Sequence, residues 1–175
     1  LPTAAIIGEP TSLRVVRMHK GYLAFEVVIA GKSAHSGYPH LGVNAIEPAG
    51  RLIGALTEMR REMEGESPPN SEYFPDVPHV ALNIGTISGG TAANIVPDRC
   101  AVACTTRLLP GMDTSSMIER IREVVDRALN GSDFHLAITN QTPPMLLDQE
   151  SKIYEMLTAQ VGQTTTHSAS YATDA

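Results

Sequence analysis

Four segments in the middle of the chain alternate hydrophobic and polar residues, which is the pattern of strands with one buried face. These segments are 21–30, 80–89, 98–108 and 134–138. In the first of them, Leu23, Phe25, Val27 and Ile29 fall on one face. We therefore predict four β-strands.

Two other segments place apolar residues every three or four positions, which is the period of an amphipathic helix. The first stripe consists of Ile46, Ala49, Leu52, Ile53, Leu56, Met59 and Met63, and the second of Met117, Ile121, Val124, Val125 and Ala128. Asn44 and Asp113 are the predicted caps at the two N-termini, and Asn130-Gly131 is predicted to end the second helix. The four prolines of 65–78 predict a loop between them.

The resulting order over 17–142 is β-α-β-β-α-β, which predicts an α+β, ferredoxin-like sandwich. Such a sandwich has a four-stranded antiparallel sheet with two helices on one face. Residues 1–16 and 143–175 have no place in it, although 3–7 form a wholly apolar run typical of a buried parallel strand and 151–161 predict a short helix. We expect these two ends to be pieces of a second domain into which 17–142 is inserted.

Composition narrows the classes of function. The 175 residues are 42% hydrophobic and contain no apolar run near the ~18 residues of a membrane helix, so no membrane partner is expected. Nineteen acidic against thirteen basic residues and only 5% aromatics argue against nucleic acid as a partner. Cys100 and Cys104 lie about 13 Å apart on a strand, too far for a disulfide, and free thiols are typical of the cytoplasm.

Four side chains are candidates for chemistry. Glu9 ends the apolar run and could be a metal ligand, a base or a surface carboxylate. His35, in a loop of small residues, could donate a hydrogen bond to an oxyanion or be a solvated histidine. Asn94 could form a hydrogen bond to a polar group of a ligand, and Arg107 could hold a carboxylate through two parallel hydrogen bonds. Both could instead be surface residues.

Three stretches of sequence carry a resemblance to a known family. They read IIGEPTSL, HKGYLAFEVVIAGKSAHSGYPHLGVNAIE and ISGGTAANIVPDRCAVACTTRLLPG, at 6–13, 19–47 and 87–111. Together they resemble the dinuclear zinc aminoacylase/carboxypeptidase metallohydrolases. The nearest members are acetylornithine deacetylases, with succinyl-diaminopimelate desuccinylases and glutamate carboxypeptidases as cousins.

The resemblance implies a fold and a set of roles. The family has a catalytic domain with two zinc ions, or cobalt in their place, interrupted by a ferredoxin-like lid that forms a homodimer. By this resemblance Glu9 is a terminal zinc ligand, and His35 reaches into the partner's active site to stabilise the oxyanion. Asn94 and Arg107 contact the substrate, Arg107 through the substrate carboxylate, and Tyr38 is expected to line the same pocket.

Other motifs of that family have no counterpart in the sequence. These are the His-x-Asp motif, the bridging Asp, the paired Glu and the last zinc-binding His. The end of the chain, 171–175, resembles a substrate loop of the type Gly-Thr-acidic-Ala, with Ala172 where glycine is usual, which weakens any role for Thr173.

We therefore expect a piece of a larger cytoplasmic enzyme, inactive alone, that hydrolyses N-acetylornithine to ornithine and acetate for arginine biosynthesis. A desuccinylase or carboxypeptidase of the same family is an alternative. A non-catalytic dimerisation or amino-acid-binding module is the other.

Overall fold

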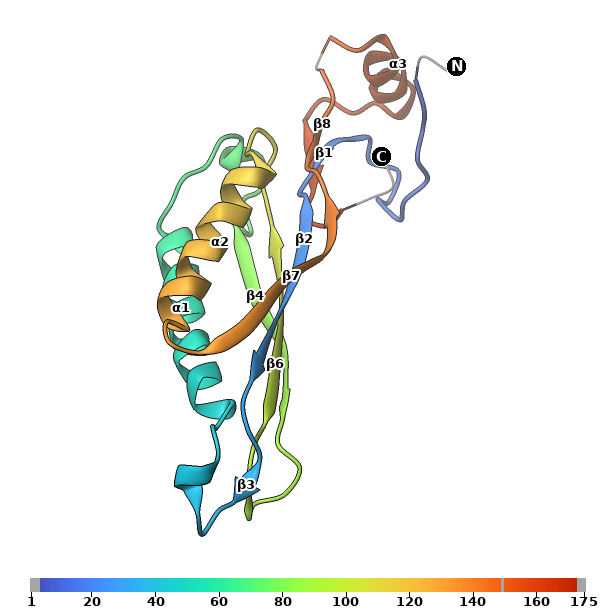
Figure 1. Cartoon of the computed structure of the whole chain (residues 1–175). Coiled ribbons are helices and arrows are strands. Elements are labelled where there is room, and N and C mark those ends of the chain that lie inside the picture. Colours follow the sequence, from blue (N-terminus) through green and yellow to red (C-terminus); the bar gives the residue numbers. More distant parts are fainter. Residues whose placement is uncertain (1–3, 149, 173–175) are drawn as a thin grey trace.

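The computed structural model describes residues 4–148 and 150–172, and its largest unit is a four-stranded antiparallel sheet of order β4-β6-β2-β7. The strands are β2 (Tyr22–Ala30), β4 (Ala81–Gly89), β6 (Arg99–Arg107) and β7 (Asp133–Thr142). Helices α1 (Ile46–Glu64) and α2 (Thr114–Ala128) cover one face of this sheet (Figure 1). The predicted ferredoxin-like sandwich is confirmed.

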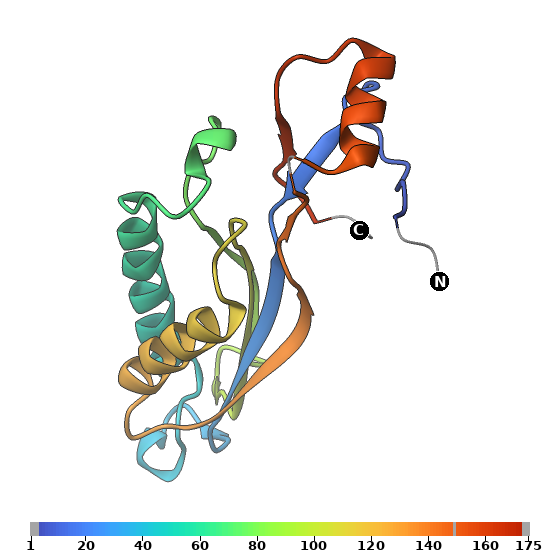
Figure 2. The same ribbon diagram turned by 90° about the horizontal axis from the view of Figure 1, so that it is seen from above.

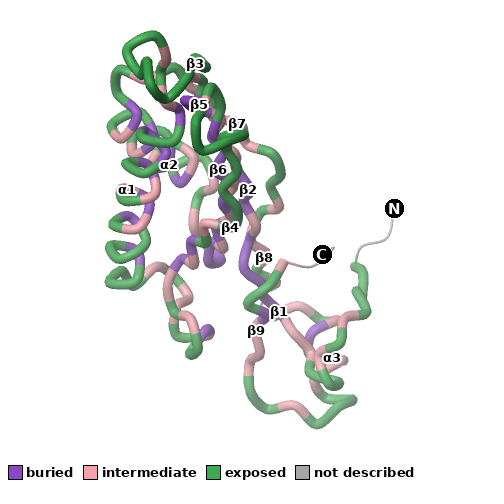
Figure 3. The backbone as a smooth tube through the Cα atoms, turned by 90° about the horizontal axis from the view of Figure 1, so that it is seen from below, coloured by how far each residue is buried: buried purple, intermediate pink, exposed green. Residues whose placement is uncertain are grey.

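The core lies between the sheet and these two helices, as the buried parts of the backbone show in Figure 3. Strand β2 supplies its predicted face: Leu23, Phe25, Val27 and Ile29 are each exposed by 1% or less. Their partners on β6 in the antiparallel register alternate in the same way, so Val102 opposes Val27 inside the core. Burying such a side chain contributes about 1.5–3 kcal/mol, which explains why the two-residue period fixes the register.

The predicted helix caps differ in outcome. Asp113 caps α2, since its carboxylate accepts hydrogen bonds from the hydroxyl and the backbone N–H of Ser116, both at 2.8 Å, and these bonds lower the pKa of Asp113. Asn44 is not the N-cap of α1, because the helix begins at Ile46 and Ala45 occupies the N-cap position without a side-chain cap. The Asn44 side chain instead accepts the N–H of Ile46 at 2.9 Å, one position earlier than predicted.

The ends of the described chain form a smaller sheet of order β8-β1-β9. Its strands are β1 (Val16–His19), β8 (Met145–Leu146) and β9 (His167–Ala169), and helix α3 (Lys152–Val161) lies beside them. Figure 2 shows this part displaced from α1 and α2. Strand β1 crosses the boundary placed between residues 16 and 17, and the division into three segments stays a prediction.

The predicted buried strand over 3–7 is wrong for the residues that the structure describes, 4–7, whereas residue 3 lies outside them. Ile6 and Ile7 are exposed by 63% and 41% and belong to no strand. A buried strand needs neighbours for its backbone N–H and C=O groups, and no described strand pairs with this segment.

Within the described residues, no helix combines the length and apolarity needed to cross a bilayer.

A buried lysine lies at the junction of the two sheets. Lys20, between β1 and β2, donates from Nζ to the carbonyl oxygens of Val77 at 2.6 Å and His79 at 2.8 Å. The ring of Phe74 lies 5.2 Å from the same Nζ. These contacts fasten the proline-rich loop, which also contains the short 3-10 helix η2 (Ser71–Tyr73), to the junction.

Burial lowers the pKa of Lys20 to about 8 from its usual value of 10.5, which makes stability depend on pH. Between pH 8 and 10.5 the native state loses this proton while the unfolded state keeps it, so the unfavourable contribution of Lys20 is full below pH 8 and is relieved as pH rises. We expect the free energy of unfolding of wild type, minus that of Lys20→Met, to rise by up to ~3 kcal/mol across this window. Urea unfolding at several pH values measures the difference, and a flat difference would contradict the expectation.

Candidate functional site

Three of the predicted site residues, His35, Tyr38 and Asn94, lie together at one end of the sandwich. His35 ends the short strand β3 (Ala34–His35), where it pairs with Ile95 of β5 (Ile95–Val96). The next residue, Ser36, donates its backbone N–H to the carbonyl oxygen of Asn94 at 2.9 Å. His35 and Asn94 are thus neighbours on an exposed tip, at the end of the molecule away from β1 and β8 (Figure 1).

The tip holds the His35 ring in one orientation. Its Nδ1 accepts the backbone N–H of Gly37 at 3.1 Å, so the proton of the neutral ring lies on Nε2. A Cβ at position 37 would come within 3.1 Å of the same nitrogen, a tight contact that would push the His35 ring aside. The Tyr38 ring lies 6.3 Å from the His35 ring, centroid to centroid. The arrangement presents an Nε2–H donor on an accessible rim beside Tyr38.

Arg107 lies at the opposite end of the sheet. It is the last residue of β6, while Arg99, the first residue of that strand, lies on the side of the His35 tip. A nine-residue strand spans about 26 Å between its first and last Cα atoms. The structure therefore brings His35, Tyr38 and Asn94 together and separates them from Arg107, so one chain cannot place all four around one small molecule.

Glu9 belongs to the terminal segments, on the same side as Arg107. It is half-buried and lines a cavity of about 550 Å³ formed by the terminal segments and α3, with mostly apolar walls. His19 lines this cavity too and is fully buried. Its Nδ1 lies 3.0 Å from the carbonyl oxygen of Lys20, and its Nε2 has no hydrogen-bond partner among the described residues. Nothing in the sequence pattern singles out His19 as a site residue.

The metal expected from the resemblance needs more ligands than this cavity provides. Across 4–148 and 150–172, no three His, Cys, Asp or Glu side chains come together as a metal centre. Zinc sites use three or four protein ligands, and Glu9 with His19 would supply two at most. The described residues do not by themselves fit a dinuclear centre.

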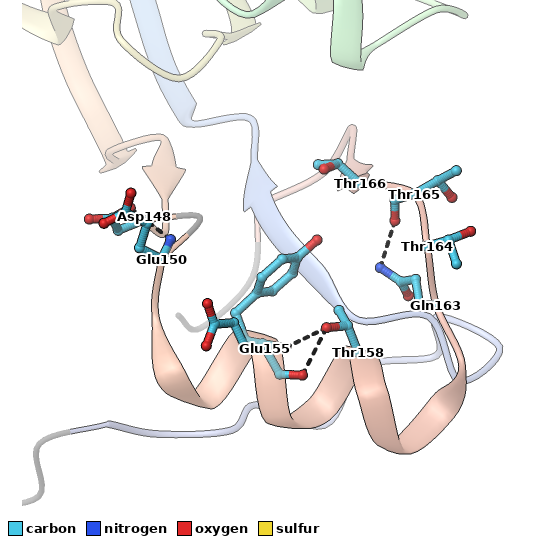
Figure 4. Close-up of a pocket in the computed structure, with 9 residues that line it drawn as sticks. Asp148, Glu150, Glu155, Thr158, Gln163, Thr164, Thr165 and Thr166 are labelled. Atoms are coloured by element: carbon cyan, nitrogen blue, oxygen red, sulfur yellow. Dashed lines mark hydrogen bonds between the residues drawn. The ribbon is translucent and has the colours of Figure 1, made fainter.

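Two other features carry no predicted site residue. A hollow of about 550 Å³ lies between α3 and the loop after it, and Figure 4 draws the residues that line it. There the hydroxyl of Thr158 donates to the carbonyl oxygen of Glu155 at 3.1 Å, and the side-chain amide of Gln163 donates to that of Thr165 at 2.9 Å. These side chains bond to backbone carbonyls only two or three residues away, so the bonds stabilise the local chain.

Cys100 and Cys104 are free and buried, and burial raises the pKa of Cys104 to about 12, which keeps this thiol protonated.

The sequence matches the peptidase dimerisation domain family over residues 17–133. An acetylornithine deacetylase from Edwardsiella ictaluri is 35% identical over 144 residues, which are 82% of this chain and 37% of that protein. A probable carboxypeptidase from Ajellomyces dermatitidis is 38% identical over 163 residues, which are 90% of this chain and 36% of that protein. The chain thus spans little more than a third of the length of these relatives.

Solved structures share the fold. The aminopeptidase PepT from Bacillus cereus superposes with a TM-score of 0.64 at 22% identity, over 91% of this chain and 40% of that one. A tripeptidase from Staphylococcus aureus gives a TM-score of 0.63 at 19% identity, over 90% and 39%. The family match and the shared sandwich lead to one conclusion: the chain belongs to the peptidase dimerisation domain family.

Proposed function

We propose that the chain is the lid and dimer-forming part of a metal-dependent amide hydrolase that acts on N-acyl amino acids in the cytoplasm. The reaction proposed for the intact enzyme is hydrolysis of N-acetylornithine to ornithine and acetate, in arginine biosynthesis. One observation carries the proposal: His35, the proposed oxyanion donor, and Arg107, the proposed carboxylate clamp, occupy opposite ends of a domain whose family is named for dimerisation.

A two-fold dimer offers a way to combine these ends. In a two-fold dimer every contact between the subunits occurs twice, with the roles of the two subunits exchanged. If the tip of one subunit reaches the Arg107 end of its partner, the partner's tip therefore reaches the Arg107 end of the first subunit. The Nε2–H of His35 would then donate to the oxyanion of the tetrahedral intermediate formed in the partner. Arg107 of that partner would hold the substrate carboxylate through two parallel N–H···O bonds.

The surface of the tip supports a protein contact there. Tyr38, Leu41 and Val43 are each more than half exposed, although all three are large and apolar. Contiguous exposed apolar side chains on a soluble protein mark interaction sites. We propose a second copy of the chain as the partner that covers them.

Zinc, or cobalt in its place, is the proposed metal of the intact enzyme, with Glu9 as one ligand. When bound, such ions polarise a carbonyl and lower the pKa of a bound water. Because the described residues form no complete metal centre, the roles proposed for this chain are oxyanion stabilisation, substrate binding and the dimer contact.

Metal analysis of the isolated chain gives a first test. We expect less than one tightly bound zinc per chain after dialysis at neutral pH, because one or two side chains hold zinc too weakly to retain it. Elemental analysis of the purified chain, with Glu9→Gln as the matched variant, measures this content. Two zinc ions retained per chain would contradict the proposed division of roles.

Substrate assays of the intact enzyme distinguish the deacetylase from a second candidate. The carboxypeptidase name of the 38%-identical relative favours hydrolysis of a C-terminal peptide bond instead. We expect release of ornithine from N-acetylornithine, compared under the same conditions with an N-succinyl amino acid and a dipeptide. If none of the three is hydrolysed by metal-loaded enzyme, the proposal fails and a non-catalytic module remains.

A further inference from the structure

Tyr22 stacks on the guanidinium of Arg107. The Cζ atom of Arg107 lies 4.5 Å from the centroid of the Tyr22 ring, within the range of a cation–π contact. The two residues stand on neighbouring strands, one position beyond the pair Leu23 and Thr106 of the β2–β6 register. Since Leu23 and Thr106 are fully buried, Tyr22 and Arg107 fall on the opposite face of the sheet, away from α1 and α2.

This contact leaves the hydrogen-bonding edge of Arg107 available. Within the described residues, Arg107 takes part in no ion pair and donates no hydrogen bond to another side chain. A ring stacked on the flat face of a guanidinium does not use its in-plane N–H groups. The contact through Cζ, together with the lack of side-chain acceptors among the described residues, therefore leaves the N–H groups of Arg107 available to a carboxylate.

The sheet row next to Arg107 on that face carries no acid. The next row of the sheet consists of Asn83, Thr105, Ala24 and Asn140, which oppose one another across the four strands. All are uncharged. The first carboxylate along β2 on this face is Glu26, whose Cα is about 13 Å from that of Tyr22. No carboxylate of β2 nearer than Glu26 therefore competes with a substrate carboxylate for the guanidinium of Arg107.

We propose that Tyr22 is a positioning residue that holds the Arg107 guanidinium in the orientation that binds the substrate carboxylate. The inference rests on the proposed function, in which Arg107 is that clamp. Tyr22 itself does not touch the substrate. It acts by restricting a long side chain that would otherwise have to be ordered when the substrate binds.

Kinetics of the intact enzyme test this role. For Tyr22→Leu we expect KM for an N-acyl amino acid to rise two- to fivefold with kcat unchanged, as for loss of a contact that acts equally on bound substrate and transition state. Tyr22→Phe keeps the ring and should restore the wild-type KM. With the carboxamide analogue of the substrate, which lacks the charge that Arg107 binds, Tyr22→Leu should match wild type.

A spectroscopic measurement on the present chain needs no activity. A ring stacked at this distance shifts the side-chain NMR resonances of Arg107 upfield, and we expect that shift in wild type and Tyr22→Phe but not in Tyr22→Leu. The absence of the shift in wild type would overturn the inference even if Tyr22→Leu failed to fold.

The outcomes separate the inference from the proposed function. If Arg107→Ala weakens binding of the carboxylate substrate while Tyr22→Leu does not, the positioning role is overturned and the proposed function stands. If Arg107→Ala has no effect, the clamp itself fails, and with it the role of Tyr22. An equal loss in Tyr22→Phe and Tyr22→Leu would assign the effect to the hydroxyl and also overturn the stacking role.

Discussion

Replacing His35 by alanine in the intact enzyme is expected to lower kcat by about 10²–10³-fold, which is the usual cost of removing one oxyanion donor. The reason lies in the local geometry: Gly37 occupies Nδ1, so Nε2 carries the proton that a developing oxyanion would accept. Steady-state kinetics with N-acetylornithine measures the loss. Because His35 is exposed and outside the core, circular dichroism and the melting temperature should stay unchanged.

The same loop offers a matched control. His40 is also exposed, lies five residues further along, and has no predicted role. His40→Ala should retain the turnover of wild type. Wild-type turnover in His35→Ala would remove His35 from the mechanism, and an equal loss in both variants would point to a general disturbance of the loop.

Replacing Arg107 by alanine should lower kcat/KM by on the order of 10- to 100-fold for a substrate with a free carboxylate, since hydrogen bonds to charged groups contribute about 1.5–3 kcal/mol. The loss should be much smaller for the corresponding carboxamide, because no charge is then left without its partner. Comparing kcat/KM for the two substrates in wild type and variant measures how much of the effect depends on the carboxylate.

Arg99 provides the control for Arg107. It begins the strand that Arg107 ends and is exposed at the far end of the sheet. Arg99→Ala should leave the preference for the carboxylate substrate intact. Equal losses for the carboxylate and the carboxamide in Arg107→Ala would show that Arg107 supports the fold and does not bind the carboxylate.

The central sandwich could be predicted from the sequence because its signals are local. Each strand of the large sheet carries its own two-residue alternation, and each covering helix its own stripe, as with Leu52, Leu56, Ile121 and Val125, all fully buried. The smaller sheet could not be predicted. Its strands have two to four residues, and the pairing of Met18 with Ser168 joins positions far apart in the sequence.

The candidate site shows the same limit. Residue type and local sequence identified His35 and Arg107 as candidates, and the resemblance gave them roles, but their separation follows from the antiparallel register of β2 and β6. The stacking of Tyr22 on Arg107 depends on that register as well. Roles expected at 173–175 lie outside the described residues. The buried state of His19 follows from the smaller sheet, which no local pattern indicates.

The central claim is that His35 and Arg107 of different subunits serve one site, and mixed dimers test it most directly. His35→Ala and Arg107→Ala subunits are co-refolded in equal amounts, and native mass spectrometry confirms that heterodimers form. Random pairing of equal amounts makes about half of the dimers mixed. If the residues act across the dimer, each mixed dimer has one intact site out of two, so activity should recover to about a quarter of wild type. If activity stays at the level of the single variants although mixed dimers are present, His35 and Arg107 do not meet across the dimer and the account is contradicted.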